Sequence, residues 1–296
     1  MAVVQELLQL EIGVLAFDVL LRLTFVLHAY LIVVFSDIPA ISLIMHMKGH
    51  NAIAPCRMCE IRGICKPGSK THYVPLDRSF FPGSPDSYNP SALPLCNHAS
   101  FLAQAEVVQS ASTTTDFDKF STMFSIKGIP LLSALSSLSF PTSFPYNFMH
   151  LIWANLIPNL VLLWTGKFKD LYHDGQEYVI MKTVWEAIGE ATFRAGEMIP
   201  AAFGSRVPNI ASEKVNMIAE TYSIWTLYLV PVLLKGRFLN NRYYNHFVKL
   251  VQLLTHCIDL EITHEEIDNL DQNFQEWVQD YERYVLPPLA LGWNFI

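Results

Sequence analysis

The pattern of apolar and polar positions predicts a small β-sheet in the amino-terminal part of the chain. Residues 25–35 are almost uninterruptedly apolar and rich in aromatic and β-branched side chains, which is typical of a central strand buried on both faces. Residues 14–21 are also apolar and are predicted to be extended and to pair with that strand. Residues 3–12 place their apolar side chains on one stripe, which predicts a short helix that ends at Gly13.

Helical periodicity dominates the rest of the chain. A loop rich in Pro, Ser, Gly and Asp over residues 77–97 and a Ser/Thr-rich break over residues 110–118 flank a short helix, residues 100–109. Further helices are expected over residues 147–164 with a kink at Pro158, 177–195 with Gly196 as the cap, 213–234, 241–258, and from a Thr263–Glu266 capping box to about Val285. The expected fold is α+β leaning mainly α, divided into residues 1–109 and 110–296.

Composition excludes several classes of protein. With 296 residues, 51% of them apolar and 16% charged, the chain can bury a substantial core, and neither disorder nor a coiled coil fits. The net charge of −7 argues against a large phosphate-binding surface. The apolar stretches at residues 23–35 and 224–234 fall short of the roughly 20 residues that span a bilayer, so no membrane partner is expected.

Cysteine usage indicates a reducing compartment. The chain has five cysteines, an odd number without regular spacing, which argues against a secreted disulfide framework. Residues 1–10 carry acid and no basic cluster, so they do not resemble a signal peptide. An intracellular location, nuclear or cytoplasmic, is therefore expected.

Asp37 is the first candidate for chemistry. It follows the predicted buried strand, and Ile38-Pro39 stops the strand and suits the first turn of a helix that could run to about Met47. Strand ends in open α/β sheets converge on a crevice, so a carboxylate at this point is a candidate metal ligand. The alternative is that Asp37 simply caps the next helix.

Cys56 and Cys59 are the second candidates. The CxxC spacing matches half of a tetrahedral zinc site. Nearby residues that could complete a zinc site are His50, Cys65 and His72. The alternative is a pair of partly buried free thiols.

The residues around both candidates resemble a known family. The match is to DDE-type transposases of the CACTA and Kyakuja-Dileera-Zisupton kind, especially their fungal members. It covers about residues 4–284, and its clearest segments are Asp37-Ile38-Pro39-Ala40, Lys48-Gly49-His50-Asn51, Pro55-Cys56-Arg57-Met58-Cys59-Glu60-Ile61, Phe144-Pro145-Tyr146-Asn147-Phe148-Met149-His150, residues 201–210 and residues 236–247.

The resemblance implies a fold and a set of site residues. The fold would be a partial ribonuclease-H-like sheet with a large helical insertion domain. Asp37 would be the second catalytic acid and a ligand of Mg²⁺ or Mn²⁺, and Cys56 and Cys59 would bind Zn²⁺ together with two distant histidines. The family's first and third catalytic acids have no match in this chain, which is therefore expected to be truncated at both ends and inactive alone, because one acid cannot hold two metal ions.

Three hypotheses of function remain. The first is a fragment of a cut-and-paste DNA transposase, in the nucleus, acting as a pseudoenzyme. The second is a retained helical DNA- or protein-binding module derived from a transposase. Its candidate DNA contacts are Arg237 and Arg242, which belong to the densest basic cluster. DNA binding by this chain alone is expected to be weak or absent. A second copy of the chain, in a homo-oligomer, is a further candidate partner. The third is an unrelated α-helical interaction protein or membrane-associated protein whose likeness to the family is spurious.

Overall fold

The computed structural model describes residues 2–65, 72–79, 81, 86–168, 173, 175–200, 202, 204–212 and 217–291, with only the backbone for residues 285–291. In these residues the chain is mostly helical, with two small antiparallel sheets of two strands each. The predicted class, α+β leaning mainly α, is confirmed.

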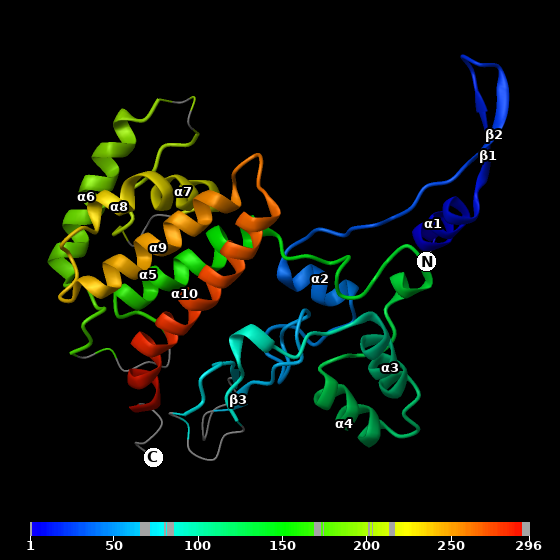
Figure 1. Cartoon of the computed structure of the whole chain (residues 1–296), viewed down its shortest axis with the longest axis horizontal. Coiled ribbons are helices and arrows are strands. Elements are labelled where there is room, and N and C mark those ends of the chain that lie inside the picture. Colours follow the sequence, from blue (N-terminus) through cyan, green and yellow to red (C-terminus); the bar gives the residue numbers. More distant parts are fainter. Residues whose placement is uncertain are drawn as a thin grey trace. The chain divides into compact units, whose positions relative to one another are not determined.

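The contacts between residues divide the chain into two compact units. Figure 1 draws the whole chain in colours that follow the sequence. Unit 1 consists of residues 1–74 and 93–147, and unit 2 of residues 75–92 and 148–296. Residues 75–92 thus belong to unit 2, and the last boundary between the units falls between residues 147 and 148, whereas the predicted one lies between residues 109 and 110. The reason is that the helices on either side of the Ser/Thr-rich break pack against each other.

Unit 1 holds both sheets and a small core. Its elements are α1 (Ala2–Ile12), β1 (Val14–Asp18), β2 (Leu23–Leu27), α2 (Ile38–Ile44), β3 (Ile64–Cys65), β4 (His72–Tyr73), α3 (His98–Gln109), α4 (Thr114–Phe124) and η2 (Leu131–Ala134). The core gathers Ile41, Met45, Met47, Phe101, Ala105, Ile126, Leu135, Leu138, Phe140 and Phe144. Leu7 and Leu8 of α1 pack against it, and the predicted helix at residues 100–109 is confirmed as α3.

The predicted buried strand at residues 25–35 is wrong. Strand β2 ends at Leu27, all five of its residues are exposed, and the backbone from residue 28 to Asp37 forms no strand. In the described residues β2 pairs only with β1, with Ala16 opposite Phe25. A run of apolar side chains is buried on both faces only where further strands and helices cover it. Here Leu31 and Val34 are partly buried against the core of unit 1, whereas Ile32, Val33 and Phe35 are exposed.

Unit 2 is a helical assembly. Its elements are η1 (Pro90–Ala92), the π-helical η3 (Met149–Leu156), α5 (Ile157–Trp164), α6 (Lys182–Met198), α7 (Ala219–Ile224), the π-helical η5 (Trp225–Leu229), α8 (Val230–Leu233), α9 (Asn241–Cys257) and α10 (His264–Leu291). The helices predicted at residues 147–164 and 241–258 are confirmed. The one predicted at 213–234 begins at Ala219, and residues 213–216 lie outside the described part.

The capping box at the start of α10 is confirmed. The backbone N–H of Thr263 donates to the Glu266 carboxylate at 2.7 Å, and the N–H of Glu266 donates to the Thr263 hydroxyl at 3.3 Å. Helix α10 then packs along α9. None of the helices found in the described ranges contains a stretch long and apolar enough to be a candidate for crossing a lipid bilayer.

Gly196 does not cap α6, contrary to the prediction. The helix runs through it to Met198. A Cβ atom at Gly196 would overlap the carbonyl oxygen of Val207, and one at Gly189, two turns earlier, would lie 2.5 Å from the Cβ of Ala211. Because neither position has room for a Cβ atom, glycine at both positions allows residues 207–211 to lie directly against the helix.

Candidate functional site

The backbone brings three cysteines to one pocket in unit 1. The segment from Met58 to Glu60 runs antiparallel to residues 94–96: the N–H of Cys96 donates to the Met58 carbonyl at 3.0 Å, and the N–H of Glu60 donates to the Pro94 carbonyl at 2.7 Å. As a result Cys56, Cys59 and Cys96 line one pocket of about 240 Å³. Its other walls include Met47, Phe101, Ile126, Arg62 and Gln104.

Arg57, between the two cysteines of the CxxC pair, is buried, with 4% of its surface exposed. Its Nε donates to the carbonyl of Phe144 at 2.6 Å and its Nη2 donates to the carbonyl of Pro145 at 2.8 Å. The guanidinium also stacks over the ring of Tyr146, 3.7 Å from the ring centre. Burial lowers the pKa of Arg57. This side chain fixes the cysteine loop to residues 144–146.

The two thiols of the pair differ in acidity. The hydrogen bond from the Cys59 thiol lowers the pKa of Cys56 to about 6, with further donation from the Tyr146 hydroxyl, 3.6 Å from the sulfur, and from backbone N–H groups. The same bond and burial raise the pKa of Cys59. Burial raises the pKa of Cys96 to about 11. Within the pair, the arrangement therefore favours the thiolate at Cys56, and the Cys59 thiol donates a hydrogen bond to it.

The donor set does not complete a zinc site. Cys56 and Cys59 supply two of the four ligands that structural zinc takes. In the described residues no group of three or more His, Cys, Asp or Glu side chains is arranged to hold a metal ion. The alternative ligands His50, Cys65 and His72 do not line this pocket.

Asp37 is the cap of α2. Its Oδ1 accepts the N–H of Ala40 at 2.6 Å, its backbone is extended, and Pro39 follows in the first turn. Asp37 does not line the thiol pocket. This contact is the one expected from the alternative interpretation, in which Asp37 caps the next helix. In the described residues no other acid lies with Asp37 in a group that could hold a metal ion. Two-metal chemistry does not fit these residues.

The predicted DNA contacts differ in their surroundings. Arg242 is engaged within unit 2: its Nη2 lies 2.9 Å from the Glu177 carboxylate, and its guanidinium stacks on the rings of Tyr243 and Tyr284. Arg237 is exposed. The basic cluster also includes Lys235 and Lys249, and Lys249 forms an ion pair with Glu276 at 2.8 Å. Nearby acids therefore offset much of the positive charge that phosphates would need.

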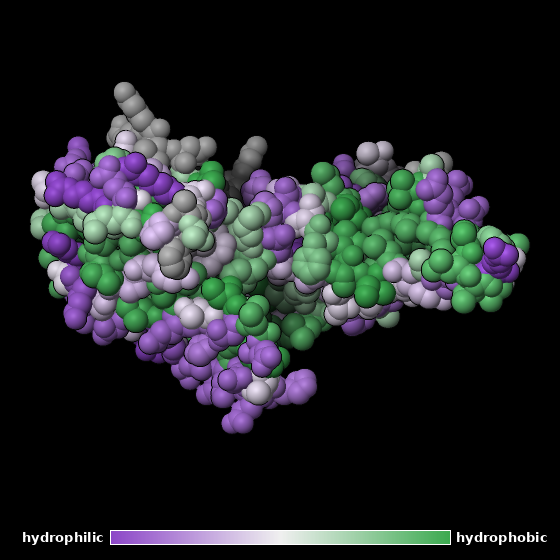
Figure 2. Space-filling model, turned by 90° about the horizontal axis from the view of Figure 1, so that it is seen from above, coloured by the Kyte–Doolittle hydropathy of each residue, from purple (hydrophilic) through white to green (hydrophobic). Residues whose placement is uncertain are grey.

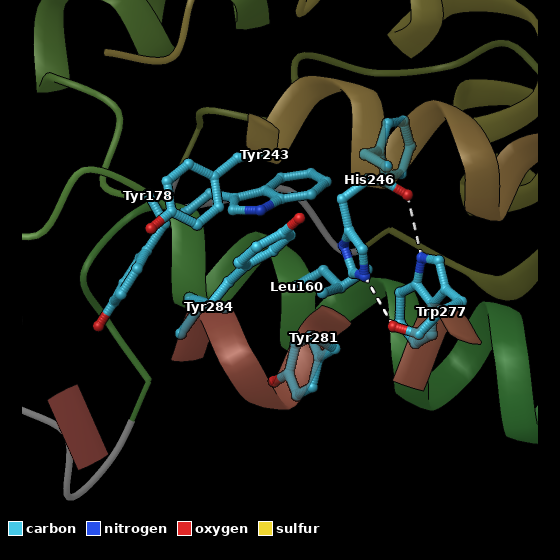
Figure 3. Close-up of a pocket in the computed structure, with 10 residues that line it drawn as sticks. Leu160, Tyr178, Tyr243, His246, Trp277, Tyr281 and Tyr284 are labelled. Carbon is cyan, nitrogen blue, oxygen red and sulfur yellow. Dashed lines mark hydrogen bonds between the residues drawn. The ribbon is translucent and has the colours of Figure 1, made fainter. Parts of the chain in front are cut away.

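A second cavity lies among aromatic side chains of unit 2 (Figure 3). Figure 3 shows His246 of α9 beside Trp277 of α10, where the His246 Nε2 donates to the Trp277 carbonyl at 2.9 Å and the Trp277 indole N–H donates to the His246 carbonyl at 3.0 Å. The two rings stack, with centres 4.5 Å apart. Burial lowers the pKa of His246. The cavity measures about 20 Å³, room for about one water molecule, so these residues are core.

Comparisons with known proteins do not identify a family. No family model matches the chain, and searches of curated proteins and of solved structures find no match either. Function is therefore inferred from the residues and contacts described above.

Sequence reasoning missed two residues of the thiol pocket. Cys96 lies 37 positions after Cys59 in a Pro-rich loop, and only the backbone pairing at residues 94–96 brings it to the pocket. Arg57 reads as an exposed charge in the CxxC motif, since arginine is rarely buried unless paired. The partners of Arg57 are the carbonyl of Pro145 and the ring of Tyr146. Both residues are visible in the sequence, but nothing in it indicates that they lie next to Arg57.

Proposed function

We propose that this chain is a fragment of a cut-and-paste DNA transposase of the CACTA and Kyakuja-Dileera-Zisupton kind, and that it does not cut DNA by itself. The motif residues around Asp37, Cys56 and Cys59 support descent from such a transposase. In this proposal β1 and β2 are the remnant of a ribonuclease-H-like sheet, and unit 2 is the helical insertion. DNA is the substrate of the parent reaction, and the nucleus is the proposed site of action.

The hydrogen bond from the Ala40 N–H to the Asp37 carboxylate supports the second half of the proposal, that this chain does not cut DNA by itself. A two-metal site needs carboxylates that hold two cations roughly 4 Å apart. The Asp37 carboxylate instead accepts an otherwise unpaired N–H at the start of α2, where the helix dipole also favours its negative charge. In this proposal Asp37 stands at the position of the family's second catalytic acid, but in this chain its carboxylate caps helix α2.

Asparagine at position 37 gives a sharp test, because Asn caps a helix about as well as Asp but is a poor cation ligand. We expect Asp37→Asn to leave the thermal unfolding midpoint nearly unchanged. We expect the wild type and Asp37→Asn to show the same background nicking of supercoiled plasmid DNA in Mg²⁺ or Mn²⁺. Metal-dependent nicking by the wild type that Asp37→Asn abolishes would show an active enzyme and refute the proposal.

Zinc content tests the thiol pocket separately. Because the pair supplies two of four ligands, we expect purified protein to carry well under one equivalent of zinc, with the same content in Cys56→Ser. Cys257→Ser, an exposed thiol of unit 2, is the matched control. One equivalent of zinc per chain by elemental analysis, lost in Cys56→Ser and kept in Cys257→Ser, would establish a zinc centre and contradict this expectation.

A retained helical binding module is the second candidate function. The continuous core of unit 2 favours it, since twenty-three buried hydrophobic residues join its helices and give this unit a fold of its own. Under this hypothesis Asp37 is vestigial and the partner is DNA or protein. Arg237, exposed near the start of α9, would be its most accessible phosphate contact.

A further inference from the structure

The amino-terminal hairpin and the segment after it form an apolar arm, residues 14–35. Between Leu15 and Phe35 thirteen large hydrophobic side chains are exposed, among them Leu20 with 93% and Phe17 with 60% of their surface. In Figure 2 the hydrophobic colour gathers at the right of the view, the end at which Figure 1 draws β1 and β2. Soluble proteins rarely expose so large a contiguous apolar surface unless a partner covers it.

The edge of β2 carries none of the features that normally prevent strands from pairing. Leu23–Leu27 contains no charge, proline or glycine. The charged residues of the hairpin lie at its turn: Asp18 accepts the N–H groups of Leu20 and Leu21 at 2.8 and 2.9 Å, and Arg22 has a positive φ of 52°. Natural sheets block exposed edges with lysine, proline or bulges, so this edge is suited to pairing.

The size of the arm fits a stable interface. Aromatic side chains such as Phe17, Phe25, Tyr30 and Phe35 bury roughly 150–250 Å² each, and nine exposed aliphatic side chains of the arm add to this area. At the exposures found here the arm therefore offers on the order of 1,000 Å² of apolar surface, against about 800 Å² that one partner contributes to a standard interface. A two-stranded hairpin is also marginally stable alone and gains from further strands.

We propose that the occupant of this surface is a second copy of the chain, joined through antiparallel pairing of the two β2 strands about a twofold axis at Phe25. This pairing places Leu23 opposite the second copy's residue 27 and the two Phe25 rings next to each other, with no charge opposed to a like charge. It gives a four-stranded sheet in the order β1-β2-β2-β1. Apolar cross-strand pairs of this kind stabilise sheets. The proposal goes beyond the function proposed above and does not depend on it.

Charge at position 25 tests the twofold axis directly. Phe25 is 40% exposed and lies outside both cores, so its replacement leaves the units folded. Analytical ultracentrifugation over a wide concentration range should give a dimer for the wild type and monomers for Phe25→Lys and Phe25→Glu alone. An equimolar mixture of Phe25→Lys and Phe25→Glu should restore the dimer, because lysine then faces glutamate. Leu260→Lys, at a fully exposed leucine of unit 2, should remain dimeric.

Hydrogen exchange distinguishes the other occupants. Amides of Leu23–Leu27 should exchange slowly in the wild type and fast in Phe25→Lys. A wild type that stays monomeric at every concentration, with these amides already protected, would show that the arm is covered within one chain. A monomer whose arm is protected only on lipid vesicles would show a membrane surface as the occupant. A mixture that stays monomeric while the wild type dimerises would exclude the axis at Phe25. Each of these results overturns the proposal.

Discussion

Replacing Gly196 by alanine is expected to destabilise unit 2 by about 1–3 kcal/mol, the usual cost of forcing extra atoms into a packed site. Helix propensity alone predicts the opposite sign, since Gly→Ala inside a helix normally gains roughly 1 kcal/mol. The reason for the loss is that a Cβ at Gly196 would overlap the backbone of Val207, whose nitrogen would lie 3.2 Å away. Backbone atoms cannot rotate aside as the end of a side chain can.

Tryptophan fluorescence during chemical denaturation measures this effect cleanly. All six tryptophans lie at residue 153 or later, in unit 2, so their signal follows the unfolding of that unit. Ala187→Gly, at an exposed position of the same helix, is the control and should cost roughly 1 kcal/mol, the propensity difference. A more stable Gly196→Ala would show that α6 and residues 207–211 are not in close contact.

Gly196 also illustrates what the sequence can and cannot predict. The helices over residues 98–109, 182–198, 241–257 and 264–291 follow from local periodicity and caps, which act within a few residues. A glycine near a helix end has two uses, as a cap with positive φ or as a point of close approach. Only the position of residues 207–211, which the sequence does not reveal, decides between them.

The candidate site shows the same limit. The cap at Asp37 is a local contact over three residues, and the sequence offered it as an alternative to a strand-end acid. The placement of residues 25–35 depends on how many strands surround them, which is not a property of the segment itself. The pocket of Cys56, Cys59 and Cys96 likewise depends on a pairing between residues far apart in the chain, and the buried state of Arg57 depends on contacts with residues 144–146.

Replacing Arg57 by methionine is expected to destabilise unit 1 by roughly 2–4 kcal/mol, because hydrogen bonds from a charged donor are among the stronger ones and their loss leaves buried acceptors unsatisfied. Methionine fills a similar volume but donates no hydrogen bond, so the carbonyls of Phe144 and Pro145 lose their donors. Arg57→Lys is expected to fall short of rescue. A single ammonium group cannot reproduce the planar fork that reaches both carbonyls and stacks on Tyr146.

Hydrogen-exchange mass spectrometry is the measurement for Arg57, since unit 1 contains no tryptophan. Peptides covering residues 140–146 should lose protection in Arg57→Met, whereas Lys119→Met, at an exposed position of α4, should keep it. Alkylation of Cys56 supplies a second readout, because the loop that Arg57 fixes also aligns the Cys59 thiol and Tyr146 hydroxyl with the Cys56 sulfur. If Arg57→Met releases the loop, the pKa of Cys56 rises towards the ordinary thiol value and its alkylation at neutral pH slows. Unchanged exchange and unchanged alkylation would show that Arg57 does not hold the site together.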